Sequence, residues 1–129
     1  MVKVGDHITL DFLGVKKEYS AKFYEDVIYK IAKAAKVGVV NISKKEFTPQ
    51  GLTMIALLME SHMSFHTFPE NGIISFDFFT CGKIHPNVAL DILKKKFSTR
   101  VLLGKNLLEI PFITMKIFIA LKDIKNIML

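Results

Sequence analysis

The chain has 129 residues, of which 50% are hydrophobic and 23% charged, and this excludes a disordered chain and fits one domain with a real core. Its single cysteine, Cys81, excludes an internal disulfide and a zinc site made of several cysteines, and it favours a reducing compartment. The net charge of +6 comes from lysines, with Arg100 as the one arginine; because arginine dominates specific base and phosphate recognition, the charge predicts a solvated surface.

The N-terminal residues predict a strand, and we expect no targeting segment there. Residues 1–9 mix apolar with polar side chains and lack the uninterrupted apolar core of a signal peptide. Residues 7–14 alternate with a period of two, which places Ile8, Leu10 and Phe12 on one face of a strand that ends at Gly14.

Residues 20–37 predict a helix with Ser20 as its N-cap and Gly38 as its stop. Its inner face is a set of apolar side chains at helical spacing: Phe23, Val27, Ile31 and Ala34. Its outer face is a set of lysines: Lys22, Lys30, Lys33 and Lys36. These charges are therefore explained without any binding partner.

The middle of the chain predicts a run of strands. Residues 39–42 form a second strand, and residues 47–51 form a turn that contains proline and glycine. Residues 52–59 are apolar except for Thr53, and this run predicts a central strand buried on both faces. Residues 63–68 alternate up to the turn at residues 69–72, and residues 73–80 supply the returning strand of a hairpin.

The C-terminal part predicts a second helix and a last strand. The helix begins at Pro86 or Asn87, and its lysines at residues 94–96 suit the negative end of the helix dipole. Its inward side chains are apolar: Ala89, Ile92, Leu93 and Phe97. Residues 101–110 form a strand, and the following apolar stretch is too short for a membrane span, so we expect a covering tail or an interfacial amphipathic segment.

This order of elements predicts an α+β fold, a two-layer sandwich in which helices pack on one face of an antiparallel sheet. Residues 1–110 form its single domain, and residues 111–129 form an apolar extension.

Polar residues that the folding pattern does not explain gather between residues 60 and 81. Glu60 and Ser61 interrupt what would otherwise be one long buried strand, which is costly unless the charge is paired. Ser61 with His66, or Cys81 with a histidine, could form a nucleophile and its base. His62 and His66 could share a metal ion, but a third ligand at suitable spacing is missing, so we expect no metal site.

Residues 60–70 read ESHMSFHTFPE, and residues 79–82 read FTCG. This pattern resembles the prokaryotic S-adenosylmethionine decarboxylase family, whose members carry Glu-Ser-His-x-Ser/Thr-x-His-Thr-Trp-Pro-Glu followed by Asp-x-Phe-Thr-Cys-Gly. Weaker similarity extends from about Val4 to Ile110 and includes the Phe-x-Pro-x-Gly-x-Thr pattern of residues 47–53.

The resemblance implies a chain that cleaves itself between Glu60 and Ser61. The Ser61 hydroxyl attacks the preceding carbonyl group, and elimination then leaves a covalent pyruvoyl group in place of the serine. By the same match, His66 and Thr53 assist this processing.

The resemblance also implies the roles of residues in turnover. The pyruvoyl group forms a Schiff base with the substrate amine and accepts electrons as carbon dioxide leaves. Cys81 then donates a proton to the substrate, which requires a protonated thiol. Phe47 and Phe68 bind the adenine ring by stacking, and Glu70 binds ribose or a cationic part of the substrate.

Departures from the family pattern leave the substrate open. Phe68 replaces the usual tryptophan, Ile73-Ile74-Ser75 replaces Tyr-Ala-Ala, and Met54 replaces a frequent glycine. Added volume beside the reactive strand would narrow a pocket built for a nucleoside. We therefore expect S-adenosylmethionine as the substrate, with L-ornithine or L-arginine as the alternative for the same machinery.

Two further alternatives are a non-catalytic homologue and a basic binding module, but the lysines lie on helix faces and not among exposed aromatics. We expect a cytoplasmic enzyme of polyamine biosynthesis that binds neither nucleic acid nor membrane. The resemblance further implies a homodimer of processed heterodimers, with the sheets meeting and the sites near the interface.

Overall fold

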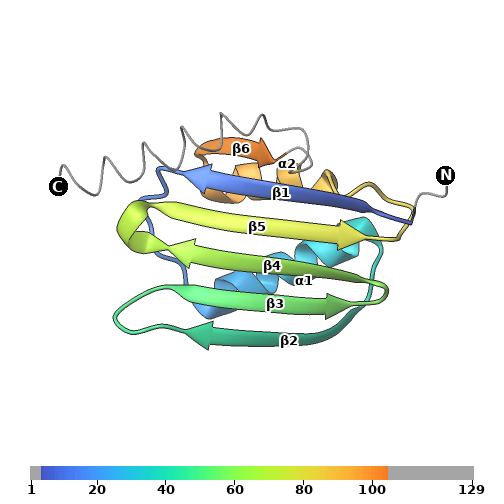
Figure 1. The fold of residues 1–129 in the computed structure, drawn as a ribbon, viewed down its shortest axis with the longest axis horizontal. Helices are drawn as coiled ribbons and strands as arrows, with labels where there is room; N and C mark the ends of the chain where they lie inside the picture. The colour runs from blue at the N-terminus through green and yellow to red at the C-terminus, as the bar shows by residue number, and fades with distance from the viewer. Residues whose placement is uncertain (1–3, 105–129) are drawn as a thin grey trace.

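The computed structural model describes residues 4–104, and these form one six-stranded sheet with two helices. Every pair of neighbouring strands is antiparallel, in the order β2-β3-β4-β5-β1-β6 (Figure 1). The strands are β1 (Asp6–Leu13), β2 (Val39–Glu46), β3 (Leu52–Leu58), β4 (Ser61–Phe68), β5 (Ile73–Thr80) and β6 (Arg100–Gly104). The helices are α1 (Ala21–Ala35) and α2 (Val88–Phe97), and a short 3-10 turn spans Pro69–Asn71.

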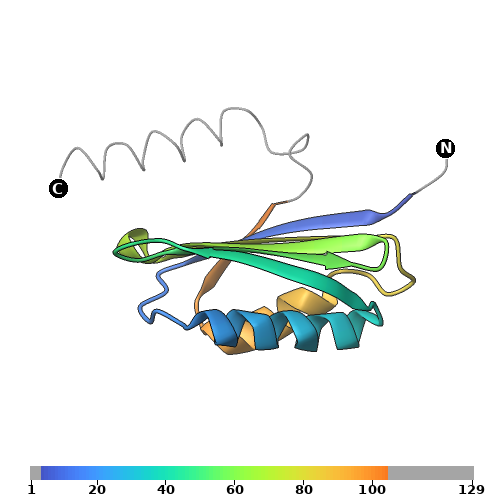
Figure 2. The ribbon, with the colours of Figure 1, turned by 90° about the horizontal axis from the view of Figure 1, so that it is seen from below.

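Both helices lie on the same face of the sheet (Figure 2), which confirms the predicted two-layer α+β sandwich. Apolar side chains from the two layers meet in one core. Its fully buried members come from four strands and both helices: Leu10, Phe12, Met54, Ala56, Met63, Phe65, Phe78, Ile28, Ile31, Ala89 and Leu93. We call the sheet face that meets the helices the inner face, and the opposite one the outer face.

Helix α1 begins as predicted but ends earlier. The Phe23 N–H donates to the Ser20 side chain at 3.2 Å, so Ser20 is the N-cap. The helix stops at Lys36, which adopts a left-handed conformation with φ of 55°, so the prediction of Gly38 as the stop was wrong. Ala34, predicted inward, is exposed, because the buried face is centred one residue further along, on Tyr24 and Ile28.

The predicted burial of residues 52–59 on both faces was wrong. Strand β3 alternates, with Met54 and Ala56 fully buried on the inner face, whereas Ile55 and Leu57 are 50% and 54% exposed on the outer face. The helices cover only one side of the sheet, and no element of residues 4–104 covers the other. An apolar run thus marks a strand with two apolar faces, of which one is exposed here.

The other expected elements are present. Helix α2 buries Ala89, Leu93 and Phe97, while Ile92 is only partly buried and residues 94–96 are exposed. Strand β6 covers the first residues of the predicted last strand, and the rest of that strand and the apolar extension at 111–129 lie outside the described residues. Within residues 4–104, no helix is long and apolar enough to cross a bilayer.

The end of α1 gives a direct stability test. Glycine adopts a positive φ without the steric cost that Lys36 pays, so we expect Lys36→Gly to raise the free energy of unfolding by about 0.5–1 kcal/mol. Lys33→Gly, in the last turn of the helix proper, should lower it by about 1 kcal/mol. Urea denaturation followed by circular dichroism measures both values, and a loss of stability in Lys36→Gly would contradict this assignment of the cap.

Candidate active site

The bond expected to break lies in a tight turn at one end of the sheet. Met59 and Glu60 form this turn between β3 and β4, and Ser61 is the first residue of β4. The prediction that Glu60 and Ser61 interrupt a buried strand was wrong, because Glu60 is exposed in the turn. Its φ of 58° is a left-handed conformation that costs a non-glycine residue roughly 1–2 kcal/mol. The Glu60–Ser61 peptide therefore joins a strained, exposed residue to a buried one.

Ser61 is buried, and its hydroxyl has no hydrogen-bond partner. The residue is 7% exposed on the inner face, in line with Met63 and Phe65. Within residues 4–104 it is the single buried side-chain oxygen or nitrogen without a partner. Such a group costs about 1–3 kcal/mol of stability. The Ser61 hydroxyl is thus not committed to any structural bond.

Cys81 lies at the same end of the sheet as Ser61. In the pairing of β4 with β5, Ser61 is opposite Thr80, and Cys81 follows Thr80 directly. The buried Thr80 hydroxyl accepts a hydrogen bond of 2.9 Å from the Gly82 N–H, which fixes the chain on the far side of Cys81. Cys81 itself is a free, exposed thiol.

The two residues predicted to assist processing form a pair on the outer face. Thr53 on β3 is directly opposite His66 on β4, and the Thr53 Oγ1 and His66 Nδ1 atoms are 3.2 Å apart. Both side chains are partly buried. The structure therefore brings this predicted pair together.

The Thr53–His66 pair and Ser61 are far apart within one chain. Five residues separate Ser61 from His66 along β4, which is about 16 Å in an extended strand. Their side chains also point to opposite faces, because side chains alternate along a strand. The hypothesis that Ser61 and His66 form a nucleophile and base within one chain was therefore wrong.

The three predicted substrate-binding residues lie at the same end of the β3–β4 hairpin as Thr53 and His66. Phe47 follows β2 and is 50% exposed, and its N–H donates to the Gly51 carbonyl group at 2.9 Å. Phe68 ends β4 and is 38% exposed, and Glu70 is exposed in the 3-10 turn. A cavity of about 420 Å³ beside this end is lined by Phe47 but not by Phe68 or Glu70. The predicted site residues thus form two groups, one at each end of the hairpin.

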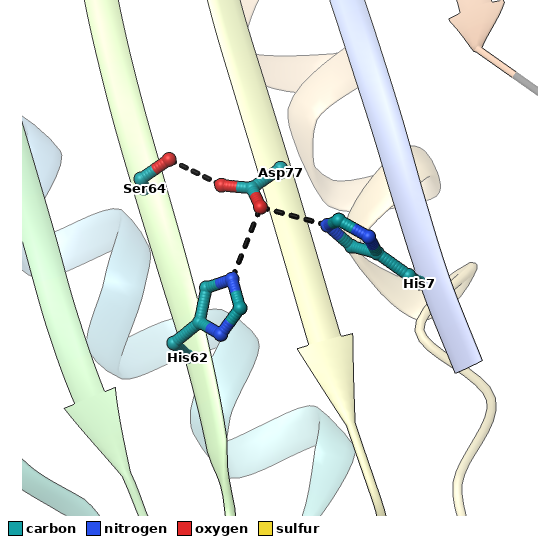
Figure 3. A network of polar contacts seen from close by, with 4 residues as sticks. All are labelled: His7, His62, Ser64 and Asp77. Atoms are coloured by element: carbon teal, nitrogen blue, oxygen red, sulfur yellow. Dashed lines mark hydrogen bonds and ion pairs between the residues drawn. The ribbon is translucent and has the colours of Figure 1, made fainter. Parts of the chain in front are cut away.

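A polar network on the outer face was not predicted from the sequence (Figure 3). The Asp77 carboxylate on β5 lies 2.7 Å from the His7 Nε2 atom on β1 and 3.1 Å from the His62 Nε2 atom on β4. Ser64 on β4 donates a hydrogen bond to its other oxygen. The rings of His7, His62 and Phe79 form a triangle, with centroids 5.8 Å apart for the two histidines and 6.0 Å from Phe79 to each histidine.

This network affects the charge of Asp77. Burial would raise the pKa of its carboxyl group, but the hydrogen bonds from Ser64, His7 and His62 together lower that pKa below its ordinary value. The carboxylate is therefore ionised at neutral pH. The polar atoms of His7, His62 and Asp77 all lie within 4.8 Å of one another, a spacing that also suits a metal ion. The Asp-x-Phe-Thr-Cys-Gly motif contains Asp77, but nothing in the sequence pairs it with His7, 70 residues away.

Comparisons with known proteins find similarity over most of the chain. The family model described as S-adenosylmethionine decarboxylase matches residues 6–105. An S-adenosylmethionine decarboxylase proenzyme of Brevibacillus brevis is 33% identical over 92% of this chain and 96% of its own length. A proenzyme of the same name from Symbiobacterium thermophilum is 41% identical over 75% of this chain and 76% of its own length.

The fold is also similar to a solved structure. The crystal structure of the adenosylmethionine decarboxylase from Aquifex aeolicus superposes with a TM-score of 0.69 and 28% identity, over 78% of this chain and 87% of that chain. The family match covers the turn at Glu60, the buried Ser61 and the exposed Cys81 together. By these matches along nearly its whole described length, the chain belongs to the S-adenosylmethionine decarboxylase family, and it is a decarboxylase.

Proposed function

We propose that this chain is a self-processing, pyruvoyl-dependent enzyme that decarboxylates S-adenosylmethionine in polyamine biosynthesis. The observation that carries the proposal is the Ser61 hydroxyl, which is buried and unpartnered beside the strained Glu60. A serine that served only to fold the chain would have its hydroxyl bonded. A hydroxyl that must attack the neighbouring carbonyl group has to remain free.

The self-cleavage can be written with this chain's own atoms and one water molecule. The Ser61 oxygen bonds to the Glu60 carbonyl carbon, and the peptide C–N bond breaks, which turns the amide into an ester and frees the serine amine. Loss of the Ser61 α-proton then breaks the bond from the β-carbon to oxygen and releases Glu60 as a carboxylate. Water replaces the remaining nitrogen, which leaves as ammonia, and residue 61 becomes a pyruvoyl group.

Residue 61 fits such a group because the Ser61 hydroxyl makes no hydrogen bond, so its loss on conversion to a pyruvoyl group breaks none. The pyruvoyl group supplies the electrophilic carbonyl that takes up electrons as carbon dioxide leaves. In this scheme Cys81 donates a proton to the substrate carbon, and its exposed position at the end of β5 leaves it accessible. A reducing, cytoplasmic location would keep Cys81 as a thiol.

Two substitutions separate processing from turnover. Ser61→Ala removes the attacking oxygen, so this chain should stay uncut and inactive. Cys81→Ala should be cut between residues 60 and 61 but should lose at least about a hundredfold in kcat, since general acid catalysis contributes about that much. Mass spectrometry of the purified proteins gives the chain masses, and release of carbon dioxide gives the rate. An uncut wild-type chain would contradict the proposal.

We further propose that processing and binding use two copies of the chain. Thr53, His66, Phe47 and Phe68 lie at the opposite end of the hairpin from Ser61. A two-fold dimer in which the outer faces meet, with the hairpins running in opposite directions, would place these residues of one copy beside the exposed Glu60 turn of the other. There they would act on the Glu60–Ser61 peptide from outside, while the Ser61 side chain faces the core. The exposed Ile55 and Leu57 on that face support such a contact, because exposed apolar patches mark interfaces.

Co-expression tests this arrangement. His66→Ala alone should be cut slowly, and Ser61→Ala alone should not be cut at all. In mixed dimers, however, the intact His66 of the Ser61→Ala chain should act on the intact Ser61 of the His66→Ala chain. Different affinity tags distinguish the two chains by mass. No gain in cleavage of the His66→Ala chain, in dimers shown to be mixed, would contradict processing between copies.

The position of the departing residues supports S-adenosylmethionine as the substrate. Met54 and Ile74 point into the core and are buried, so their volume packs against the helices and does not narrow the exposed end of the hairpin that carries Phe47 and Phe68. Phe68 and Ile73 lie opposite each other on the outer face, where the family pattern has the larger tryptophan and tyrosine. The expectation that added volume narrows the pocket therefore fails at Met54, Phe68, Ile73 and Ile74. At Ser75, which replaces an alanine on the outer face, the added oxygen donates a hydrogen bond to Asp11.

Release of carbon dioxide should accordingly be measured with S-adenosylmethionine, L-ornithine and L-arginine at equal concentrations. We expect at least a hundredfold higher kcat/KM for S-adenosylmethionine, because stacking by Phe47 and Phe68 has no counterpart in the two amino acids. Phe47→Ala is a suitable companion variant, since it should raise KM for the nucleoside substrate alone. Activity restricted to the amino acids would replace this substrate assignment.

A further inference from the structure

Self-cleavage would leave the start of β4 as a free chain end. In the uncut chain, the turn at Met59 and Glu60 ties Ser61 to β3. A cut between residues 60 and 61 removes this covalent link and makes residue 61 a chain end. Chain ends fray unless side chains or packing hold them. The reactive group would thus sit on the residue most exposed to fraying.

The Asp77 network holds this part of β4. His62 is the second residue of the strand and Ser64 is the fourth, and both are hydrogen-bonded to the Asp77 carboxylate. The His62 ring is also stacked on Phe79, with an angle of 18° between the rings. The same carboxylate is bonded to His7 on β1, so the network spans three neighbouring strands.

The bonds of Asp77 join β4 to β5, the strand that leads to Cys81. Asp77 lies opposite Ser64, and three residues further along β5, Thr80 lies opposite Ser61. The backbone pair of Ser61 and Thr80 is the last one in this register. Side-chain bonds just inside that last pair limit how far the end of β4 can separate from β5.

We propose that Asp77 is a positioning residue that clamps the cut end of β4 to β5 and so keeps residue 61 beside Cys81. This inference rests on the proposed self-cleavage. It predicts that the hydrogen bonds of Asp77 limit fraying of β4 more in the cut chain than in the uncut chain. In the uncut chain, the turn at Met59 and Glu60 already holds the start of the strand. A carboxylate with a purely structural role would stabilise the start of β4 equally in the cut and the uncut chain.

Hydrogen exchange followed by mass spectrometry compares the two forms, in buffer with a chelator so that no metal ion replaces the hydrogen bonds. The Asp77→Asn substitution is introduced into the wild-type chain, which is cut, and into Ser61→Ala, which is not. In the cut chain we expect amide exchange in residues 62–65 to rise about tenfold or more, as the bonds to an ionised carboxylate are lost. In the uncut chain we expect a rise of less than about twofold.

Two further variants make the comparison specific. Asp11→Asn is the matched control, because Asp11 accepts a hydrogen bond of 2.6 Å from Ser75 on the same face but joins β1 to β5 and not β4. It should leave exchange in residues 62–65 unchanged. Ser64→Ala removes one bond and keeps the carboxylate, so it should act in the same direction as Asp77→Asn with a smaller size. The kcat of cut Asp77→Asn should fall while KM changes little.

Each other outcome counts against the clamp. Equal effects of Asp77→Asn in the cut and uncut chains would reduce Asp77 to a structural residue. An Asp77→Asn chain that remains uncut would show that Asp77 is required for cleavage itself, and this result would overturn the proposal. A wild-type chain that remains uncut would overturn the proposed function itself, and mass measurement identifies that case before any exchange is recorded.

Discussion

The alternation of side chains along β4 is the constraint on which the rest of the structure depends. Because successive residues of a strand point to opposite faces, Ser61 faces the helices with the core, whereas His62, Ser64 and His66 face the other side. Burial on the inner face isolates the Ser61 hydroxyl from hydrogen-bond partners. The outer face then has room for polar side chains from neighbouring strands, and both the Thr53–His66 pair and the Asp77 network occupy it.

The antiparallel pairing of β4 adds a second constraint, which is the division of the site into two ends. The tight turn at Glu60 and the end of β5 meet at one end, so Ser61 and Cys81 are neighbours. The longer connection after β2 and the 3-10 turn after β4 meet at the other end, with Phe47 and Glu70. One sheet thus separates Ser61 from the other residues that the family resemblance assigns to processing and binding, and this separation is the physical argument for the proposed site shared between copies.

Sequence patterns predicted the elements well where local physics decides them. The period of two in β1, the N-cap at Ser20 and the turn before β5 are set by neighbouring residues, and all three are confirmed. The errors arose where distant parts of the chain decide the outcome. Residues 52–59 place apolar side chains on both faces of the strand, but only the face that the helices cover is buried. Glu60 looked like a charge inside a strand because its turn has no glycine or proline to mark it.

The sequence by itself determined the family, because residues 60–70 and 79–82 match its pattern, and this resemblance carries the proposed roles of Ser61 and Cys81. It also determined the two-layer fold, since alternation and helical periodicity are local properties. Only the tertiary structure decided which of the site residues share a face and an end of the sheet. It joined His7 to Asp77 across 70 residues and placed His66 away from Ser61. The reason is that register and strand order arise from burying the whole core at once, and no single segment carries that information.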